Sequence, residues 1–310
     1  MTATATAATN AQVLTASRAL VFPGQGSQRP GMALPWRDHP AWDRWAEADD
    51  VLGADVTRLG TDASAEELRN PVNCQIALFV HAAVLLSAWR EAGGAAEITA
   101  GHSLGEYNAL LAAGVVSFAD GLRLVERRAS ATGAAALAAP GGMVACLGGD
   151  GASLRAAAAE AGASVANDNA EGQLVVAGDD AALERFTELA DGARVRRLEV
   201  GAAYHSPHMA PAVEPFAQAL AATDFADASM PVVSNVDAQP HTLAADWPEL
   251  LRRQLTAPVR WRETVLTMQG LGVREVVELG ASPVLTGLVK RTAPALSRSN
   301  ISTPDDLAAL

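Results

Sequence analysis

The stretch Gly101-His102-Ser103-Leu104-Gly105-Glu106 decides the fold prediction. Glycine at both ends allows a sharp turn from a strand into a helix, which leaves Ser103 on a strained turn with its hydroxyl exposed. Residues 97–100 before the turn are strand-like, and residues 107–113 after it are rich in Leu and Ala and favour a helix. This context predicts a nucleophile elbow, although an ordinary glycine-bounded turn would match the same motif.

Composition restricts the class of protein. With 310 residues, 49% of them hydrophobic, the chain can bury a large core, and no apolar stretch is expected to reach the length of a membrane span. A net charge of −12 argues against nucleic acid as a partner. Cys74 and Cys146 lack metal-ligand spacing, so we expect buried thiols, no metal site and a cytoplasmic protein. The Ala- and Thr-rich residues 1–17 lack the apolar core of a signal peptide and are expected to form a disordered leader.

Strands and helices alternate along the rest of the chain. This alternation predicts an α/β fold whose mainly parallel sheet is covered by helices on both faces. The large unit is expected to comprise residues 18–140 and 201–297. Residues 141–200 have the order β-α-β-β-α-β, which predicts an inserted ferredoxin-like small subdomain. Residues 298–310 are expected to form a weakly specified C-terminal tail.

A serine nucleophile needs a base to take its proton, and histidine is the usual one. His102 adjoins Ser103, but neighbouring side chains on a tight elbow point apart. His205 and His208 follow the small subdomain, where the chain returns to the large unit and could line a cleft. The residue pattern alone does not choose between these two, and a structural role is common for a lone histidine.

Arg128 is predicted to point inward. Leu124, Val125 and Arg128 share a helix face by i+3 and i+4 spacing, whereas Arg123 and Arg127 lie on another face. A buried guanidinium needs an anionic partner, and its planar fork suits a carboxylate. The partner could belong to a ligand or could be a protein acid in a structural ion pair.

Five motifs occur in order along the chain, at residues 20–28, 101–107, 204–209, 231–236 and 280–285. Together they resemble the malonyl-CoA:acyl-carrier-protein transacylase family, including the acyltransferases of polyketide synthases. The tryptophan-rich residues 34–42 look most like the discrete, stand-alone acyltransferases of polyketide-type pathways. The resemblance covers residues 19–293. It implies a hydrolase-like α/β core with an inserted ferredoxin-like subdomain.

The resemblance also implies roles for individual residues. It makes Ser103 the acylated nucleophile and His205 its base, with the main-chain carbonyl of Gln254 orienting the histidine. The backbone N–H groups of Gln25 and Leu104 are implied as oxyanion donors. Arg128 is implied to bind the free carboxylate of the acyl group. The implied substrate-pocket residues are His102, Tyr204, Ala202 and Gln75.

The activity that the resemblance implies is a ping-pong transfer of a malonyl-type group from coenzyme A to the pantetheine thiol of an acyl carrier protein. It implies no cofactor beyond the coenzyme A thioester, no metal, no membrane and no nucleic acid, and we expect a monomer. An acidic carrier protein would have to dock on locally basic surface, such as residues 252–262 and 290–291, although these residues could equally form solvated helix faces.

The chain departs from the family pattern before His205. Tyr204 supplies the aromatic ring typical of malonyl-selective members, but Ala202 fits neither the malonyl nor the methylmalonyl type. Ala202 and the tryptophan-rich residues 34–42 leave open another activity, the transfer of an unusual acyl or aminoacyl group between carrier proteins. Arg128 counts against this alternative, because an aminoacyl group has no free carboxylate for it to bind. A serine hydrolase that releases stalled acyl groups is a further alternative, and a non-catalytic docking module is disfavoured by the intact motifs.

Overall fold

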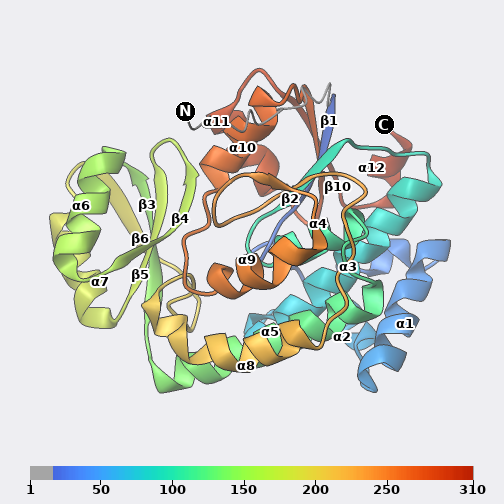
Figure 1. Ribbon diagram of the computed structural model, residues 1–310, viewed down its shortest axis with the longest axis horizontal. Coiled ribbons are helices and arrows are strands. Elements are labelled where there is room, and N and C mark those ends of the chain that lie inside the picture. Colours follow the sequence, from blue (N-terminus) through green and yellow to red (C-terminus); the bar gives the residue numbers. More distant parts are fainter. Residues whose placement is uncertain (1–16, 310) are drawn as a thin grey trace, which may run out of the picture.

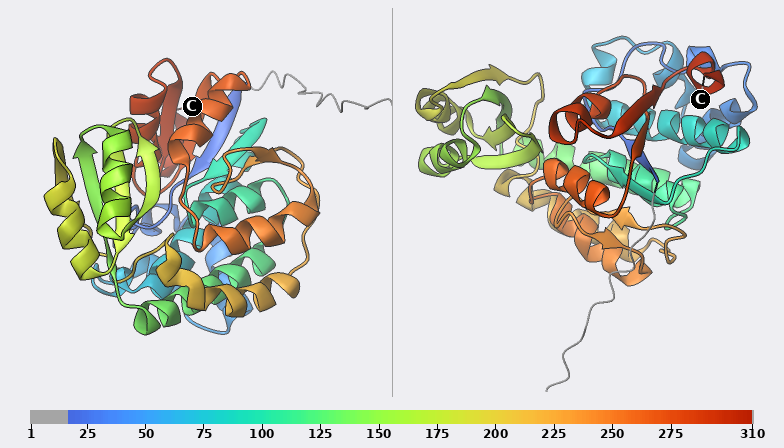
Figure 2. Two further views of the ribbon diagram at one scale, coloured as in Figure 1. Left: turned by 60° about the vertical axis from the view of Figure 1, so that its left-hand side comes forward. Right: turned by 90° about the horizontal axis from the view of Figure 1, so that it is seen from above.

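The computed structural model describes residues 17–309 of the chain. The leader expected at residues 1–17 therefore lies outside the described part, apart from Ser17. The described residues form two α/β units of different size, and the smaller unit stands beside the larger one in Figure 1 and in both views of Figure 2.

Strands and helices follow one another along the two units, as the alternation in the sequence predicted. The strands are β1 (Arg18–Phe22), β2 (Ile98–Gly101), β3 (Gly142–Gly148), β4 (Ser164–Ala170), β5 (Gln173–Gly178), β6 (Ala193–Arg197), β7 (Val232–Val233), β8 (Pro240–His241), β9 (Glu275–Leu279) and β10 (Ser297–Ile301). The helices are α1 (Asp43–Leu52), α2 (Thr57–Thr61), α3 (Pro71–Glu91), α4 (Gly105–Ala112), α5 (Phe118–Ala138), α6 (Gly151–Ala161), α7 (Asp180–Leu189), α8 (Ala210–Ala221), α9 (Trp247–Gln254), α10 (Trp261–Gly270), α11 (Leu285–Thr292) and α12 (Pro304–Ala308).

The larger sheet has six strands in the order β10-β9-β1-β2-β7-β8, and every neighbouring pair is parallel except β7 and β8. Side chains of β1 alternate between two cores. Leu20 and Phe22 pack in a core with α3, α4 and α5, whereas Ala19 and Val21 pack in a second core with α10 and α11. Helices therefore cover both faces, so the prediction of an α/β fold with a mainly parallel sheet is confirmed.

The smaller sheet has four strands in the order β4-β5-β3-β6, and all its pairs are antiparallel. Its chain order is β3-α6-β4-β5-α7-β6, inserted between α5 and α8 of the larger unit. A separate core around Leu154, Val176 and Phe186 joins α6 and α7 to this sheet. Figure 1 shows both helices on the side away from the larger unit, so the sheet itself faces the larger unit.

The end of the chain differs from the expected weakly specified tail. β10 pairs in parallel with β9 at the edge of the larger sheet, and Ile301 is fully buried. Trp36 Nε1 donates a hydrogen bond of 2.9 Å to the Ser302 carbonyl, and a capping box of Thr303 and Asp306 begins α12. The prediction was wrong here because it missed the sheet pairing that orders β10 and the local capping box that begins α12.

Helix α3 also differs from expectation. By length and composition it could span a membrane, contrary to the expectation that no apolar stretch approaches that length. However, 83% of its most apolar window is buried inside the protein, so its composition is that of a central core helix.

Candidate active site

Ser103 lies on a strained turn between β2 and α4, with a φ of +53°. The glycines on either side are required by close backbone contacts. A Cβ on Gly101 would lie 1.9 Å from the carbonyl carbon of Gly105, and a Cβ on Gly105 would lie 2.0 Å from the Phe22 carbonyl oxygen. The strand, tight turn and helix therefore follow one another as the sequence predicted.

His205 lies against the serine hydroxyl. Its Nε2 is 2.7 Å from Ser103 Oγ, and its Nδ1 is 2.8 Å from the main-chain carbonyl oxygen of Gln254. Because a carbonyl can only accept, Nδ1 carries the proton and Nε2 is free to accept from the hydroxyl. His208 instead contacts Ser206, so the structure separates the two histidines that the sequence left as alternatives.

Burial sets the charge of the His205 imidazole. Only 4% of His205 is exposed, and desolvation, with the positive charge of Arg128 as the next cause, lowers the pKa of His205 to about 3. The imidazole is therefore neutral at physiological pH and able to take a proton from Ser103.

Arg128, on α5, reaches the same hydroxyl from the interior. Its Nη2 lies 3.1 Å from Ser103 Oγ and 3.2 Å from Gln254 Oε1, and its Nη1 donates to Gln75 Oε1. The guanidinium also lies 5.5 Å from the ring centroid of Tyr107. Among residues 17–309, no Asp or Glu comes within ion-pair distance of Arg128, so its observed partners are all uncharged.

A second set of buried side chains holds the elbow. Asn235 Oδ1 accepts from the Ser103 N–H at 2.7 Å, and the Asn235 N–H donates to Glu106 Oε1 at 2.8 Å. Gln254 Nε2 donates to the Ser103 carbonyl at 3.0 Å and also to Glu106. Sequence reasoning gave Asn235 and Glu106 no role, although both lie inside motifs that it quoted. The available signal for Asn235 was its place two residues after the buried strand β7.

Glu106 leads to a prediction about stability. Burial raises the pKa of Glu106 to about 7 from its usual 4.5, so the folded protein holds this proton more tightly than the unfolded chain. The resulting stabilisation is complete below pH 4.5 and is lost as pH rises through 7, a change of about 3 kcal/mol. Urea unfolding across this pH range is expected to show that Glu106→Gln lacks this fall in unfolding free energy. Parallel pH profiles for the two proteins would contradict the shift.

The loop after β1, which carries Gln25, packs against the elbow, which carries Leu104. A Cβ on Gly24 would meet the His102 carbonyl oxygen at 2.5 Å and the Leu104 nitrogen at 3.5 Å, so only glycine allows this approach. In the described part of the chain, neither the Gln25 nor the Leu104 N–H donates to another group. Both donors are therefore available to a ligand.

A cleft of about 100 Å³ opens at Ser103. It is lined by Gln25, His102, Ser103, Met143, Asn167, Leu198, Val200, Tyr204 and His205. A cavity of about 450 Å³ adjoins it at Tyr204, and another of about 370 Å³ adjoins it at His102 and Asn167. Of the predicted pocket residues, His102 and Tyr204 therefore line the cleft.

The other two predicted pocket residues lie elsewhere. Ala202 is fully buried in the large core and lines none of the three cavities, so its assignment to the pocket stays a prediction. Gln75 is also fully buried and contacts Arg128 rather than the cleft. Its Nε2 has no hydrogen-bond partner among the described residues.

Comparison with known proteins gives the family. The family model described as "Acyl transferase domain" matches residues 19–303. The chain belongs to the acyl transferase domain family. Membership makes it an acyltransferase.

Several relatives in this acyl transferase family are similar over nearly their full length. The chain is 40% identical over 297 residues to a malonyl CoA-acyl carrier protein transacylase of Synechocystis, covering 94% of this chain and 99% of that protein. It is 39% identical over 301 residues to the protein of the same name from Escherichia coli K12, covering 94% and 97%.

Solved structures in the same family agree with this fold. An acyl-carrier-protein S-malonyltransferase from Burkholderia pseudomallei matches with a TM-score of 0.92 and 39% identity, over 94% of this chain and 98% of that one. A complex of a type II PKS acyl-carrier protein with its malonyl-transacylase matches with a TM-score of 0.91 and 37% identity, over 94% and 98%.

Proposed function

We propose that this chain transfers a malonyl group from coenzyme A to the pantetheine thiol of an acyl carrier protein. The observation that carries the proposal is a Ser103–His205 pair beside a buried Arg128 that has no carboxylate partner among the described residues. A guanidinium in this position suits the free carboxylate of a malonyl group. The names of the full-length relatives, and the relative solved with its carrier protein, support the same reaction.

The first half-reaction acylates the serine. Ser103 Oγ attacks the thioester carbonyl while His205 Nε2 takes the hydroxyl proton, and the N–H groups of Gln25 and Leu104 hold the developing oxyanion. The carbon–sulfur bond then breaks, and His205 returns the proton to the departing coenzyme A thiolate. Arg128 holds the distal carboxylate throughout.

The second half-reaction runs in reverse with a different thiol. The pantetheine thiol of the carrier protein attacks the Ser103 ester, His205 takes the thiol proton, and Ser103 Oγ leaves with that proton. Gln254 serves both steps because its carbonyl keeps the His205 tautomer fixed. The proposed reaction needs no metal and no cofactor beyond the thioester, and we propose a monomer acting in the cytoplasm.

We assign the pantetheine arm to the cavity of about 370 Å³ between the two units. Its walls carry the amides of Asn167, Asn169 and Gln173, which suit the two amides of pantetheine, and its other wall is α11. Lys290 and Arg291 are exposed on α11, and Arg291 lines this cavity, so a basic surface for an acidic carrier protein lies at its mouth.

Within this proposal, the small unit is of the ferredoxin-like type and the larger unit is hydrolase-like, with boundaries at residues 140 and 200. The strand order β4-β5-β3-β6 around two helices on one face supports the first assignment, and the serine turn between β2 and α4 supports the second. The ring of Tyr204 beside His205 favours malonyl over methylmalonyl, a discrimination of about 1–3 kcal/mol.

A second candidate is transfer of a larger acyl or aminoacyl group between carrier proteins. The observation that favours it is the cavity of about 450 Å³ beyond Tyr204, since malonyl alone needs only the smaller cleft at Ser103. Hydrolysis of stalled acyl groups is a third candidate and would use the same two residues.

Intact-mass measurement after brief incubation with malonyl-CoA tests these candidates. We expect a malonyl adduct that maps to Ser103, persists in buffer and is discharged when a holo acyl carrier protein is added. Loss of the adduct in buffer alone would instead identify a hydrolase. No adduct from malonyl-CoA, with an adduct from an acylated carrier protein, would establish the second candidate.

A further inference from the structure

The edge strand β4 of the small unit carries the stretch Asn167-Asp168-Asn169, and its pairing with β5 is irregular on both sides of Asp168. Such irregularities re-aim side chains and are frequent beside active sites. Asn167 lines the cleft at Ser103, and Asn169 Oδ1 lies 2.8 Å from His102 Nε2. Asp168 is aimed elsewhere, and the proposed reaction gives it no role.

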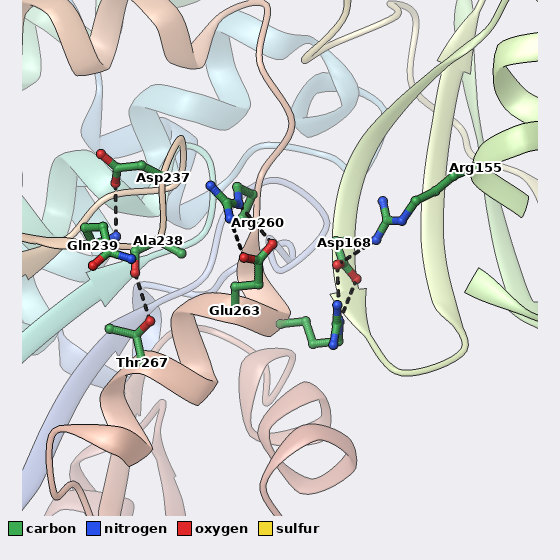
Figure 3. Close-up of polar contacts among 9 residues, drawn as sticks. Arg155, Asp168, Asp237, Ala238, Gln239, Arg260, Glu263 and Thr267 are labelled. Atoms are coloured by element: carbon green, nitrogen blue, oxygen red, sulfur yellow. Dashed lines mark hydrogen bonds and ion pairs between the residues drawn. The ribbon is translucent and has the colours of Figure 1, made fainter. Parts of the chain in front are cut away.

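Asp168 is a buried carboxylate, 4% exposed, shared by two arginines. Arg155 of α6 donates from Nη2 at 2.8 Å, and Arg262 of α10 donates from Nε at 3.2 and 3.3 Å to the two carboxylate oxygens. Figure 3 shows Arg155 reaching Asp168 from the far side of β4. Arg155 belongs to the same unit as Asp168, so of these two ion pairs only the one with Arg262 crosses between the units.

The backbone repeats this connection. The Val259 N–H donates to the Ala166 carbonyl and the Asp168 N–H donates to the Val259 carbonyl, both at 2.9 Å, which makes a short parallel bridge. Arg260, next along the chain, pairs with Glu263 (Figure 3) and so does not compete for Asp168. The segment 254–262 is thus attached to the small unit at Val259 and Arg262.

The same segment is attached to both catalytic groups. The Gln254 carbonyl holds His205 Nδ1, and the Arg260 N–H donates at 3.0 Å to the carbonyl of Asn235, whose side chain accepts from the Ser103 N–H. A displacement of β4 relative to this segment would therefore move the Asn167 and Asn169 amides relative to the serine.

We propose that Asp168 and Arg262 are positioning residues: their ion pair sets the distance between the amide wall of the pantetheine arm and the catalytic serine. The identity of the ligand rests on the proposed function, whereas the mechanical role rests on the contacts alone. Because the carboxylate is buried, removing the arginine from the larger unit leaves it with one partner. The Val259 bridge then remains as the other attachment between β4 and segment 254–262, so β4 is held less firmly and can shift.

The test compares Arg262→Gln with Arg155→Gln, which removes the other partner of the same carboxylate without touching the contact between units. Three quantities are measured for each: the dissociation constant of coenzyme A by calorimetry, amide hydrogen exchange across residues 166–170, and labelling of Ser103 by phenylmethylsulfonyl fluoride, a small serine reagent without pantetheine. We expect Arg262→Gln to weaken coenzyme A binding about tenfold and to speed exchange, with labelling within about twofold of wild type. Arg155→Gln is expected to leave all three within about twofold.

Equal effects of the two substitutions on coenzyme A binding would overturn the proposal, as would a parallel loss of serine labelling, which would indicate general loosening of the site. Asp168→Asn combined with Arg262→Gln should bind coenzyme A no more weakly than Arg262→Gln alone, and additive losses would contradict the pairing. Failure of the wild type to bind coenzyme A would overturn the pantetheine role together with the proposed function. This outcome is distinguishable from a failure of the positioning role alone, because it is seen in the wild-type protein before any residue is substituted.

Discussion

Replacing Ser103 by Ala is expected to abolish both the malonyl adduct and the transfer to the carrier protein. Ser103 Oγ is the only hydroxyl that His205 Nε2 contacts among the described residues. The strained turn points this one side chain at the histidine, so a neighbouring side chain cannot take its place as nucleophile. The measurement is intact mass with malonyl-CoA beside a carrier-protein transfer assay. An adduct of unchanged yield on the variant would place the acyl group on another residue and would contradict the proposed reaction.

Replacing His205 by Ala is expected to slow adduct formation by about 10⁴-fold while leaving Ser103 in place. The variant loses the neutral imidazole that takes the hydroxyl proton, and the Gln254 carbonyl loses its donor. A histidine base with an ordinary pKa would lose activity as pH falls through 6.5. Because the pKa of His205 is lowered to about 3, wild-type acylation should instead stay level between pH 7.5 and 5.

His208→Ala is the matched control, since it removes the other histidine of the same segment. His208 contacts Ser206 at 3.4 Å and does not contact Ser103. We expect its acylation rate to remain within about threefold of wild type. A loss as large as that of His205→Ala would contradict the assignment of the base.

Local pattern was sufficient for the elbow and for the direction of Arg128. Gly101 and Gly105 are required by contacts within a short turn, so their spacing in the sequence reports the geometry directly. Helix periodicity placed Arg128 on the apolar face of α5, and the structure buries it to 2% exposure. In both cases the information lies within a few residues along the chain.

Contacts between distant segments could not be predicted in this way. His205 meets Ser103 across 102 positions, and its own φ of +56° has no signature in the sequence because the residue is not glycine. Likewise, β10 is ordered by pairing with β9, a neighbour that only the folded sheet supplies. Family resemblance, not residue pattern, chose His205 over His208 from the sequence.

Replacing Arg128 by Ala is expected to lower the rate of malonyl adduct formation by about 10²–10³-fold. The guanidinium is buried, and among the described residues it has only uncharged partners, so a malonyl carboxylate would supply the missing anion. Removal of the charge also leaves Gln75 Oε1 without its donor. Part of the loss therefore comes from an altered cleft, which the choice of substrate can separate.

Acetyl-CoA provides that separation because it lacks the distal carboxylate. If Arg128 binds the carboxylate, Arg128→Ala should lose malonyl transfer far more than acetyl transfer, and the ratio of the two kcat/KM values should fall towards one. Arg128→Lys keeps the charge but not the planar fork, so it should restore only part of the ratio. An equal loss for both substrates would mean that Arg128 organises Ser103 and Gln254 without binding the acyl group. The donor would then be an acyl group without a free carboxylate, as in transfer between carrier proteins.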